Sequence, residues 1–416
     1  MIARAVLRAA TVFAIVLAVR APARAEAVTV HADPTAATTA IELWYRAPAA
    51  GYDFRTPGIA RLALASVAAS KVAGGASVSE IVNQVGGVLS LAVYPDIVMV
   101  GASVPSSQAQ QVFRAMTNAY FGATITSSGL KLGAEDSALV AAQLPYDSER
   151  TLQDALFAQL FAEGPAHYAP IPDATAFAKF TQSDVQNFAA RAFRRDNAIV
   201  SLAGNVTGLA APLHSEAATT APLDSTPASQ ATQTTVTSHE AGVGVAWAGP
   251  PISDTRAATA LDFVADYLFD ADHGTVAKSS NVQRDVLLSG QFITLHDPGA
   301  LIVTISGDTA NSILPNVLDA VDKMQQPLDP ATFAAARKAF FYHILSQIQT
   351  PIERADNNGW YAAEGNAQYA PGDPSGIYLA AANSLDPKFV AETVRRYLRN
   401  PVVVHLVRAS GESTAT

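Results

Sequence analysis

Eight histidines are the side chains of this 416-residue sequence that could bind a metal ion or move a proton near neutral pH. No two of them lie one helical turn apart, and the adjacent pair His239-Glu240 has no second histidine close to it. The chain also lacks cysteine, a Gly-x-Ser-x-Gly nucleophile turn and a glycine-rich phosphate loop. The histidines are therefore interpreted as scattered surface or loop residues: His31, His167, His214, His239, His273, His296, His343 and His405.

The elements that would position a site occur twice in the sequence. Residues 183–202 predict a helix that ends in Phe-Arg-Arg-Asp and is followed by an apolar strand, and residues 387–406 repeat this pattern about 204 positions later. A period of that length corresponds to a whole domain, because solenoid repeats are much shorter. The same offset relates residues 97–100 to 301–304, and 44–48 to 247–250. We therefore predict two copies of one domain fold.

Residues 1–25 are typical of a secretory signal peptide. Arg4 and Arg8 form a basic start, residues 9–19 are apolar, and Ala23-Arg24-Ala25 provides a small-residue cleavage site. The apolar run of 11 residues is too short for a membrane span, and no later run is long enough. We expect an exported protein, periplasmic or extracellular, without a membrane span after removal of the signal.

Composition limits the classes of partner. Loss of the four arginines in the signal peptide changes the formal charge from -9 to -13, which argues against nucleic-acid binding. Because there is no cysteine, the stability of the exported chain must come from core burial. With 49% hydrophobic residues, each half is long enough to form a substantial core.

The predicted organisation has five parts. A segment rich in Ala, Thr, Ser and Pro, residues 207–237, separates the two repeats and is interpreted as an extended linker. The first domain then covers residues 26–206 and the second covers residues 238–410. The signal peptide and a tail at 411–416 complete the chain.

Each half is predicted to be α+β. In the first half, strands are expected at 39–45, 88–93, 97–104 and 198–203, with helices at 57–72, 78–85 and 107–121 and a further run of helices before the last strand. Thr181-x-x-Asp184 predicts a capping box, and Asp329-Pro330 and Asp386-Pro387 predict helix starts in the second half. Hairpin strands and consecutive helices indicate two homologous domains, each an antiparallel-rich sheet with helices packed on one face.

The order of these pieces resembles the M16 peptidases, the insulinase, pitrilysin and mitochondrial processing peptidase relatives. The resemblance covers roughly residues 35–410 and rests on order and spacing rather than on any single motif. It implies duplicated α+β domains. The pieces that carry it are Pro57-Gly58-Ile59-Ala60, Val85-Gly86-Gly87, the 161–165 loop Phe-Ala-Glu-Gly-Pro, the 181–184 helix start and the 195–206 segment with Gly204-Asn205-Val206.

The family places its zinc site on the helix after Pro57, in a His-x-x-Glu-His motif whose two histidines bind zinc while the glutamate activates water. The corresponding positions here are Arg61, Leu64 and Ala65, and the family's distal glutamate falls near Ala141 or Ala142. The resemblance therefore implies that this chain has no catalytic residue and no metal or other cofactor at the family's site. By itself the chain is expected not to be an enzyme.

The second half of the family also contributes an arginine and, seven residues later, a tyrosine that contact substrate. Arg284 matches the arginine, while the tyrosine position becomes Gln291, or Phe292 if the loop is one residue longer. Phenylalanine would keep an aromatic face but lose the hydroxyl that could donate to an oxyanion. Arg284 and Phe292 are thus the candidate substrate-binding residues, and a surface arginine is the alternative.

Pairs of chains are known in this family, in which one subunit carries zinc and the other does not. The resemblance implies that this chain is the non-catalytic subunit, with a zinc-bearing paralogue and an extended peptide as partners in a shared chamber. Two alternatives stay open: a stand-alone peptide-binding or scaffold protein, and a metallopeptidase with an unorthodox site.

Overall fold

The computed structural model describes residues 28–71, 75–209, 220–279, 286–364 and 374–409. The predicted signal peptide, the tail at 411–416 and the candidate residue Arg284 lie outside the described residues. No helix in the described ranges is long and apolar enough to cross a membrane.

The first half contains a five-stranded sheet in the order β1-β6-β2-β4-β3. Only the β1/β6 pair is parallel, and the other neighbours are antiparallel. Apolar, β-branched sequences form its central strands, and β2 is buried along nearly its whole length. The strands are β1 (Val28–Ala32), β2 (Thr38–Arg46), β3 (Val88–Val93), β4 (Ile97–Pro105) and β6 (Ala198–Gly204).

In the described residues of the first half there are six α-helices, with short 3-10 turns between some of them. Two begin with the predicted type of cap, because Ser77 with Glu80 and Thr181 with Asp184 form reciprocal capping boxes. The helices are α1 (Ile59–Ala69), α2 (Val78–Gln84), α3 (Ala109–Tyr120), α4 (Ser127–Gln143), α5 (Ser148–Leu160) and α6 (Gln182–Ala192). The short strands β5 (Phe161–Glu163) and β7 (Thr226–Pro227) pair with each other.

The second sheet has the order β10-β11-β9-β12-β8, which is the order of the first sheet for the equivalent strands. Again only the outermost pair β12/β8 is parallel. Identical topology in two halves confirms the duplication predicted from the 204-residue offset. The strands are β8 (Gln233–Ser238), β9 (Gly242–Ala248), β10 (Leu287–Ile293), β11 (Ala300–Ser306) and β12 (Val402–Arg408).

The helices of the second half follow the order of the first. Asp329 and Asp386 cap the helices whose starts were predicted, each accepting hydrogen bonds from two backbone amides. The helices are α7 (Thr255–Phe269), α8 (Ala310–Lys323), α9 (Pro330–Ser346), α10 (Pro351–Ala363), α11 (Pro374–Asn383) and α12 (Pro387–Tyr397).

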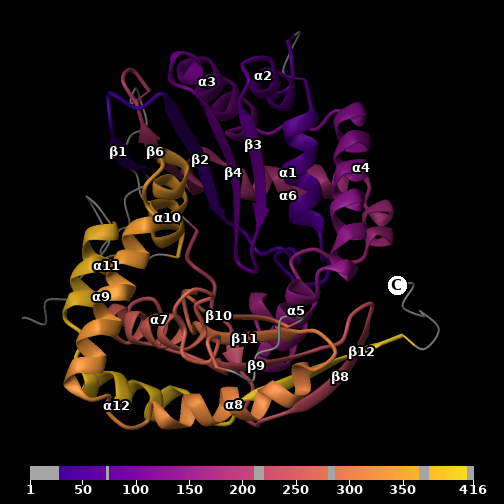
Figure 1. The fold of residues 1–416 in the computed structure, drawn as a ribbon. Helices are drawn as coiled ribbons and strands as arrows, with labels where there is room; N and C mark the ends of the chain where they lie inside the picture. Colours follow the sequence, from indigo (N-terminus) through magenta and orange to yellow (C-terminus); the bar gives the residue numbers. More distant parts are fainter. Residues whose placement is uncertain (1–27, 72–74, 210–219, 280–285, 365–373, 410–416) are drawn as a thin grey trace, which may run out of the picture.

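Each half lends one helix to the other half's sheet (Figure 1). Helix α5 packs on β9, β11 and β12, where Leu152 and Leu156 join the buried cluster of the second sheet. Helix α10 packs on β1, β2 and β6, where Ala355 and Ala362 lie against the first sheet. The predicted layer of helices covers the opposite face of each sheet, so the two halves cannot separate without exposing apolar surface.

The segment predicted as a linker includes regular structure. Residues 233–238 form β8, the edge strand beside β12, and residues 226–227 form β7. Polar β-branched residues dominate β8, and its alternating burial is that of an edge strand rather than of an unpaired loop.

Candidate functional site

Helix α1 forms the centre of the predicted site and is almost entirely buried. It starts after Gly58, whose φ of 88° is in the left-handed region, and a Cβ there would lie 2.7 Å from the ring of Pro172. From Ile59 to Ala68 every residue of α1 is buried. A helix with no exposed face reflects contacts on all sides, here with the first sheet's core, α4 and α6.

Arg61 occupies the predicted first ligand position with a side chain that is 6% exposed. It forms an ion pair with Asp136 of α4, and its Nη1 donates to the carbonyl of Leu91 at 3.1 Å. Burial lowers the pKa of Arg61 from its ordinary value, while the charge of Asp136 opposes that shift. Arginine remains protonated at neutral pH, so this position holds a cation and repels a metal ion.

The other two motif positions offer no ligand atoms. Leu64 is fully buried in the first core, and its carbonyl accepts a hydrogen bond from the Tyr120 hydroxyl at 2.9 Å. Ala65 is 4% exposed. Aliphatic side chains can neither coordinate zinc nor polarise a water molecule. Leu64 and Ala65 therefore cannot take the roles of the glutamate and the second histidine of the motif.

Close packing of α1 on α4 sets which residue faces Arg61. A Cβ at Gly133 would lie 2.6 Å from Ser66 N, and one at Gly129 would lie 2.9 Å from Ser66 O. Glycine at these two positions lets the helix axes approach closely, which aligns Asp136 with Arg61. The hydroxyl oxygens of Ser66 and Ser137, buried between the helices, have no hydrogen-bond partner within the described part of the chain.

Asp136, which the sequence analysis did not single out, is the carboxylate at the site. Ala142 is exposed in the last turn of α4 and has no described contact with Arg61. Ala141 is buried. A signal was available, since a buried arginine needs a counter-charge and α4 contains Glu135 and Asp136 in its middle.

Arg61 also meets the open edge of the first sheet. Among the described residues β3 pairs only with β4, and their ladder begins with the hydrogen bond from Tyr94 N–H to Ile97 O at 2.9 Å. Hydrogen-bonded and non-hydrogen-bonded pairs alternate along an antiparallel ladder. Leu91, opposite Val100, is therefore in a non-hydrogen-bonded pair, and its N–H and C=O point away from β4. The guanidinium of Arg61 binds this outward carbonyl.

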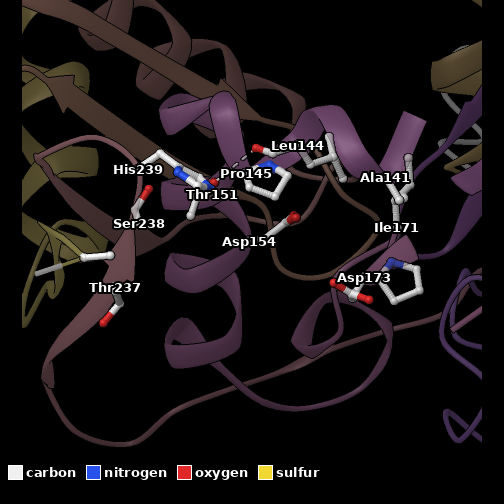
Figure 2. Close-up of a pocket in the computed structure, with 12 residues that line it drawn as sticks. Ala141, Leu144, Pro145, Thr151, Asp154, Ile171, Asp173, Thr237, Ser238 and His239 are labelled. Carbon is white, nitrogen blue, oxygen red and sulfur yellow. Dashed lines mark hydrogen bonds between the residues drawn. The ribbon is translucent and has the colours of Figure 1, made fainter. Parts of the chain in front are cut away.

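A pocket of about 390 Å³ opens beside the end of α4 (Figure 2). Ala141 lines it from α4, Asp154 from α5, and Ser238 and His239 from the end of β8, so both halves contribute to its wall. Burial raises the pKa of Asp154, and the guanidinium of Arg150, whose Nε lies 3.0 Å from it, opposes the shift. Two carboxylates, Asp154 and Asp173, and the imidazole of His239 are among the residues that line the pocket.

Of the two predicted substrate-contact residues, Phe292 lies in the second core and not beside Arg61. Phe292 of β10 is 7% exposed, and its ring packs in the second core, where a Cβ at Gly249 would lie 2.5 Å from it. Gln291 is exposed on the same strand. Arg284 lies outside the described residues, so its predicted role stays a prediction.

No protein-family model matches this sequence. The comparison with curated proteins also finds no match. Solved structures do match in three dimensions: a protease from Helicobacter pylori superposes with a TM-score of 0.77 at 14% identity, over 92% of this chain and 97% of that one.

An inactive domain of a peptidase M16 from Pseudomonas fluorescens gives a TM-score of 0.71 at 14% identity, over 93% of this chain and 97% of that one. The periplasmic protease PqqL from Escherichia coli gives 0.65 at 13% identity, over 90% of this chain and 43% of PqqL. At such identities the likeness concerns the fold. The chain thus has an M16-like fold of duplicated α+β halves, as the resemblance in sequence predicted.

Proposed function

We propose that this protein is an exported, non-catalytic M16-like subunit that binds an extended peptide and pairs with a zinc-bearing chain of the same fold. The observation that carries the proposal is α1, where the three motif positions hold an arginine ion-paired with Asp136 and two aliphatic residues, Leu64 and Ala65. A helix so arranged can support a wall of a chamber but cannot activate water.

The edge of β3 supports the peptide-binding part of the proposal. Peptides add to open sheet edges through backbone hydrogen bonds, and β3 is half-exposed along most of its length. The outward N–H and C=O of Leu91 could pair with such a peptide. Arg61 holds the outward carbonyl of Leu91 through its Nη1, so a peptide at this edge would lie close to a positive charge.

Two of the solved structures with a similar fold support the proposal that this chain pairs with a zinc-bearing chain. The inactive M16 domain from Pseudomonas fluorescens has nearly the same extent as this chain. PqqL is a single chain of which this fold matches 43%, leaving length for a second unit of similar size. A non-catalytic unit joined to an active one, in one chain or in two, is the arrangement we infer for this protein.

A stand-alone peptide-binding protein is the second candidate, because the β3 edge belongs to this chain alone. Both candidates require peptide binding, so the experiment tests that step first. The purified protein is titrated with a fluorescein-labelled random-sequence decapeptide pool, and anisotropy is recorded. Saturable binding is expected.

The variant Leu91→Pro is expected to weaken this binding at least about tenfold, because proline removes the outward N–H but no β3–β4 ladder hydrogen bond. Leu91→Ala is the matched control, since it shortens the side chain and keeps the N–H. Equal binding by Leu91→Pro and Leu91→Ala would rule out peptide addition at this edge.

A further inference from the structure

A cluster of aspartates and histidines lies in the second half, between helices α7 and α9. These helices are the equivalents of α1 and α4, but the cluster lies at the C-terminal ends of α7 and α9, whereas Arg61 is in the first turn of α1. Asp266 is in the last turn of α7, Asp270 follows at its C-terminus, and His343 is in the last turn of α9. His273 is in the turn after α7.

The atoms of this cluster converge as metal ligands do. One carboxylate oxygen from each of Asp266 and Asp270 and one ring nitrogen of His343 lie within 4.8 Å of one another. Asp270 Oδ2 is 3.6 Å from His343 Nδ1, close to the separation of two ligands around a tetrahedral ion. Asp266 Oδ1 contacts the same Nδ1 directly, and a bound ion would replace this contact.

The remaining atoms of the carboxylates are held by a second histidine. His273 Nε2 lies 2.9 Å from Asp266 Oδ2, and His273 Nδ1 lies 2.6 Å from Asp270 Oδ1. Each ring nitrogen of His273 thus faces one carboxylate, a neutral imidazole donating to one of the two, and the other carboxylate oxygens are directed at His343. Hydrogen bonds that fix ligating carboxylates in this way are typical of metal sites.

Charge within the cluster favours a cation. Asp262, Asp266 and Asp270 follow one another at one-turn spacing on one face, and in the described chain the ion-pair partners of Asp266 and Asp270 are histidines. Asp266 is 5% exposed in its side chain, where unpaired charge is costly, whereas His343 is 35% exposed and provides a route from solvent.

We propose that Asp266, Asp270 and His343 bind a divalent transition-metal ion such as Zn²⁺, with His273 orienting the two carboxylates. Two oxygens and one imidazole nitrogen suit a first-row transition metal better than Ca²⁺ or Mg²⁺, which prefer oxygen ligands. The ion would join the end of α7 to the end of α9. This departs from the expectation, drawn from sequence, that the chain holds no metal, because His273 and His343 are 70 positions apart and only the fold brings them together.

The test uses the mature protein, stripped with EDTA and dialysed. Isothermal titration with Zn²⁺ is expected to show one saturable site per chain, and Co²⁺ is expected to give visible d–d absorption. His343→Asn and Asp270→Asn should each weaken Zn²⁺ binding at least about tenfold. Asp270→Asn is the milder change, and circular dichroism confirms that each variant is folded.

His296→Asn is the matched control, because His296 forms a single ion pair with Asp224 outside the cluster. It should bind Zn²⁺ as the wild type does, with Mg²⁺ giving no saturable heat in any variant. Absence of a saturable Zn²⁺ site in the wild type would overturn the proposal. So would a site that both cluster variants retain unchanged or that His296→Asn removes.

Discussion

Arg61 and Asp136 form an ion pair between α1 and α4 that is buried on the arginine side and half-exposed on the aspartate side. Arg61 is at the position where the M16 resemblance predicts the first zinc ligand, and Asp136 lies about one and a half turns before the predicted distal position. The pair also ties both helices to the open edge of β3 through Leu91. The ion pair thus has a structural role, because it joins α1, α4 and β3.

Asp136→Asn should lower the free energy of unfolding by about 1–3 kcal/mol, because the buried guanidinium of Arg61 loses its counter-charge. Urea denaturation followed by circular dichroism measures the change. Glu135→Gln is the matched control, since Glu135 is exposed and its nearest cation, Lys131, is 4.0 Å away; its effect should stay within about 0.5 kcal/mol. Equal effects of the two variants would show that the pair does not stabilise α1.

Gly359→Ala should loosen the contact between the halves. Gly359 of α10 lies against Trp44 of β2, and an added Cβ would lie 2.0 Å from the indole Nε1. The alanine has the better helix propensity, yet the clash should destabilise the protein by about 1–3 kcal/mol. Tryptophan fluorescence during unfolding reports the change.

Gly122→Ala serves as the control for this prediction, because a Cβ at Gly122 meets nothing within 4 Å. Its effect should be within about 0.5 kcal/mol. If Gly359→Ala is as stable as Gly122→Ala, α10 is not held against the first sheet as described.

Stability should fall as pH rises from about 4 to about 7. Burial raises the pKa of Asp96 to about 6 and the pKa of Asp262 to about 7. Burial also raises the pKa values of Glu42 and Glu364 well above the usual range of a glutamate. The unfolded carboxyls ionise near pH 4, so above that pH the folded state binds more protons than the unfolded state, and the free energy of unfolding decreases.

Thermal unfolding between pH 4.5 and 8 measures this dependence. His343 adds to it in the same direction, because its pKa is raised: burial alone would lower it, but the hydrogen bond and charge of Asp266 outweigh burial. Stability from the protonated His343 is lost as pH rises through that pKa. Glu364→Gln should flatten the decline, and a midpoint that rises steadily from pH 4.5 to 8 would contradict the assignment.

Local sequence signals predicted much of this fold. Capping boxes at Thr181 and helix starts at Asp329 and Asp386 depend on neighbouring residues, and these predictions are confirmed. The duplication could be read because equivalent strands keep their spacing. The packing of α5 on the second sheet and of α10 on the first sheet could not be predicted from the sequence. It depends on which apolar face of each sheet is left uncovered by the helices of its own half.

Less of the candidate site around Arg61 than of the fold could be predicted from the sequence. Which residue of α4 faces Arg61 depends on how closely Gly133 lets the helices approach, and no spacing rule along the chain contains that distance. The convergence of Asp266 and His343, 77 positions apart, has the same origin. Side chains that meet across two helices are specified by packing rather than by local pattern.

Arg284 is predicted to contact peptide in a mixed complex with a zinc-bearing chain. Arg284→Ala should lower the gain in peptide cleavage without separating the two proteins. Lys278→Ala, which removes an exposed cation six residues earlier, should leave that gain unchanged. An effect of the same size from both variants would indicate a general loss of charge instead of a contact.

Co-expression with a zinc-bearing M16-like chain from the same source tests the central claim most directly. Size-exclusion chromatography and cleavage of a fluorogenic peptide are measured for the mixture and for each chain alone. The account predicts co-elution, no cleavage by this chain alone, and cleavage by the mixture roughly tenfold or more above that of the zinc-bearing chain, because a completed chamber positions the peptide. Separate elution with unchanged activity of the zinc-bearing chain, or cleavage by this chain alone, would contradict it.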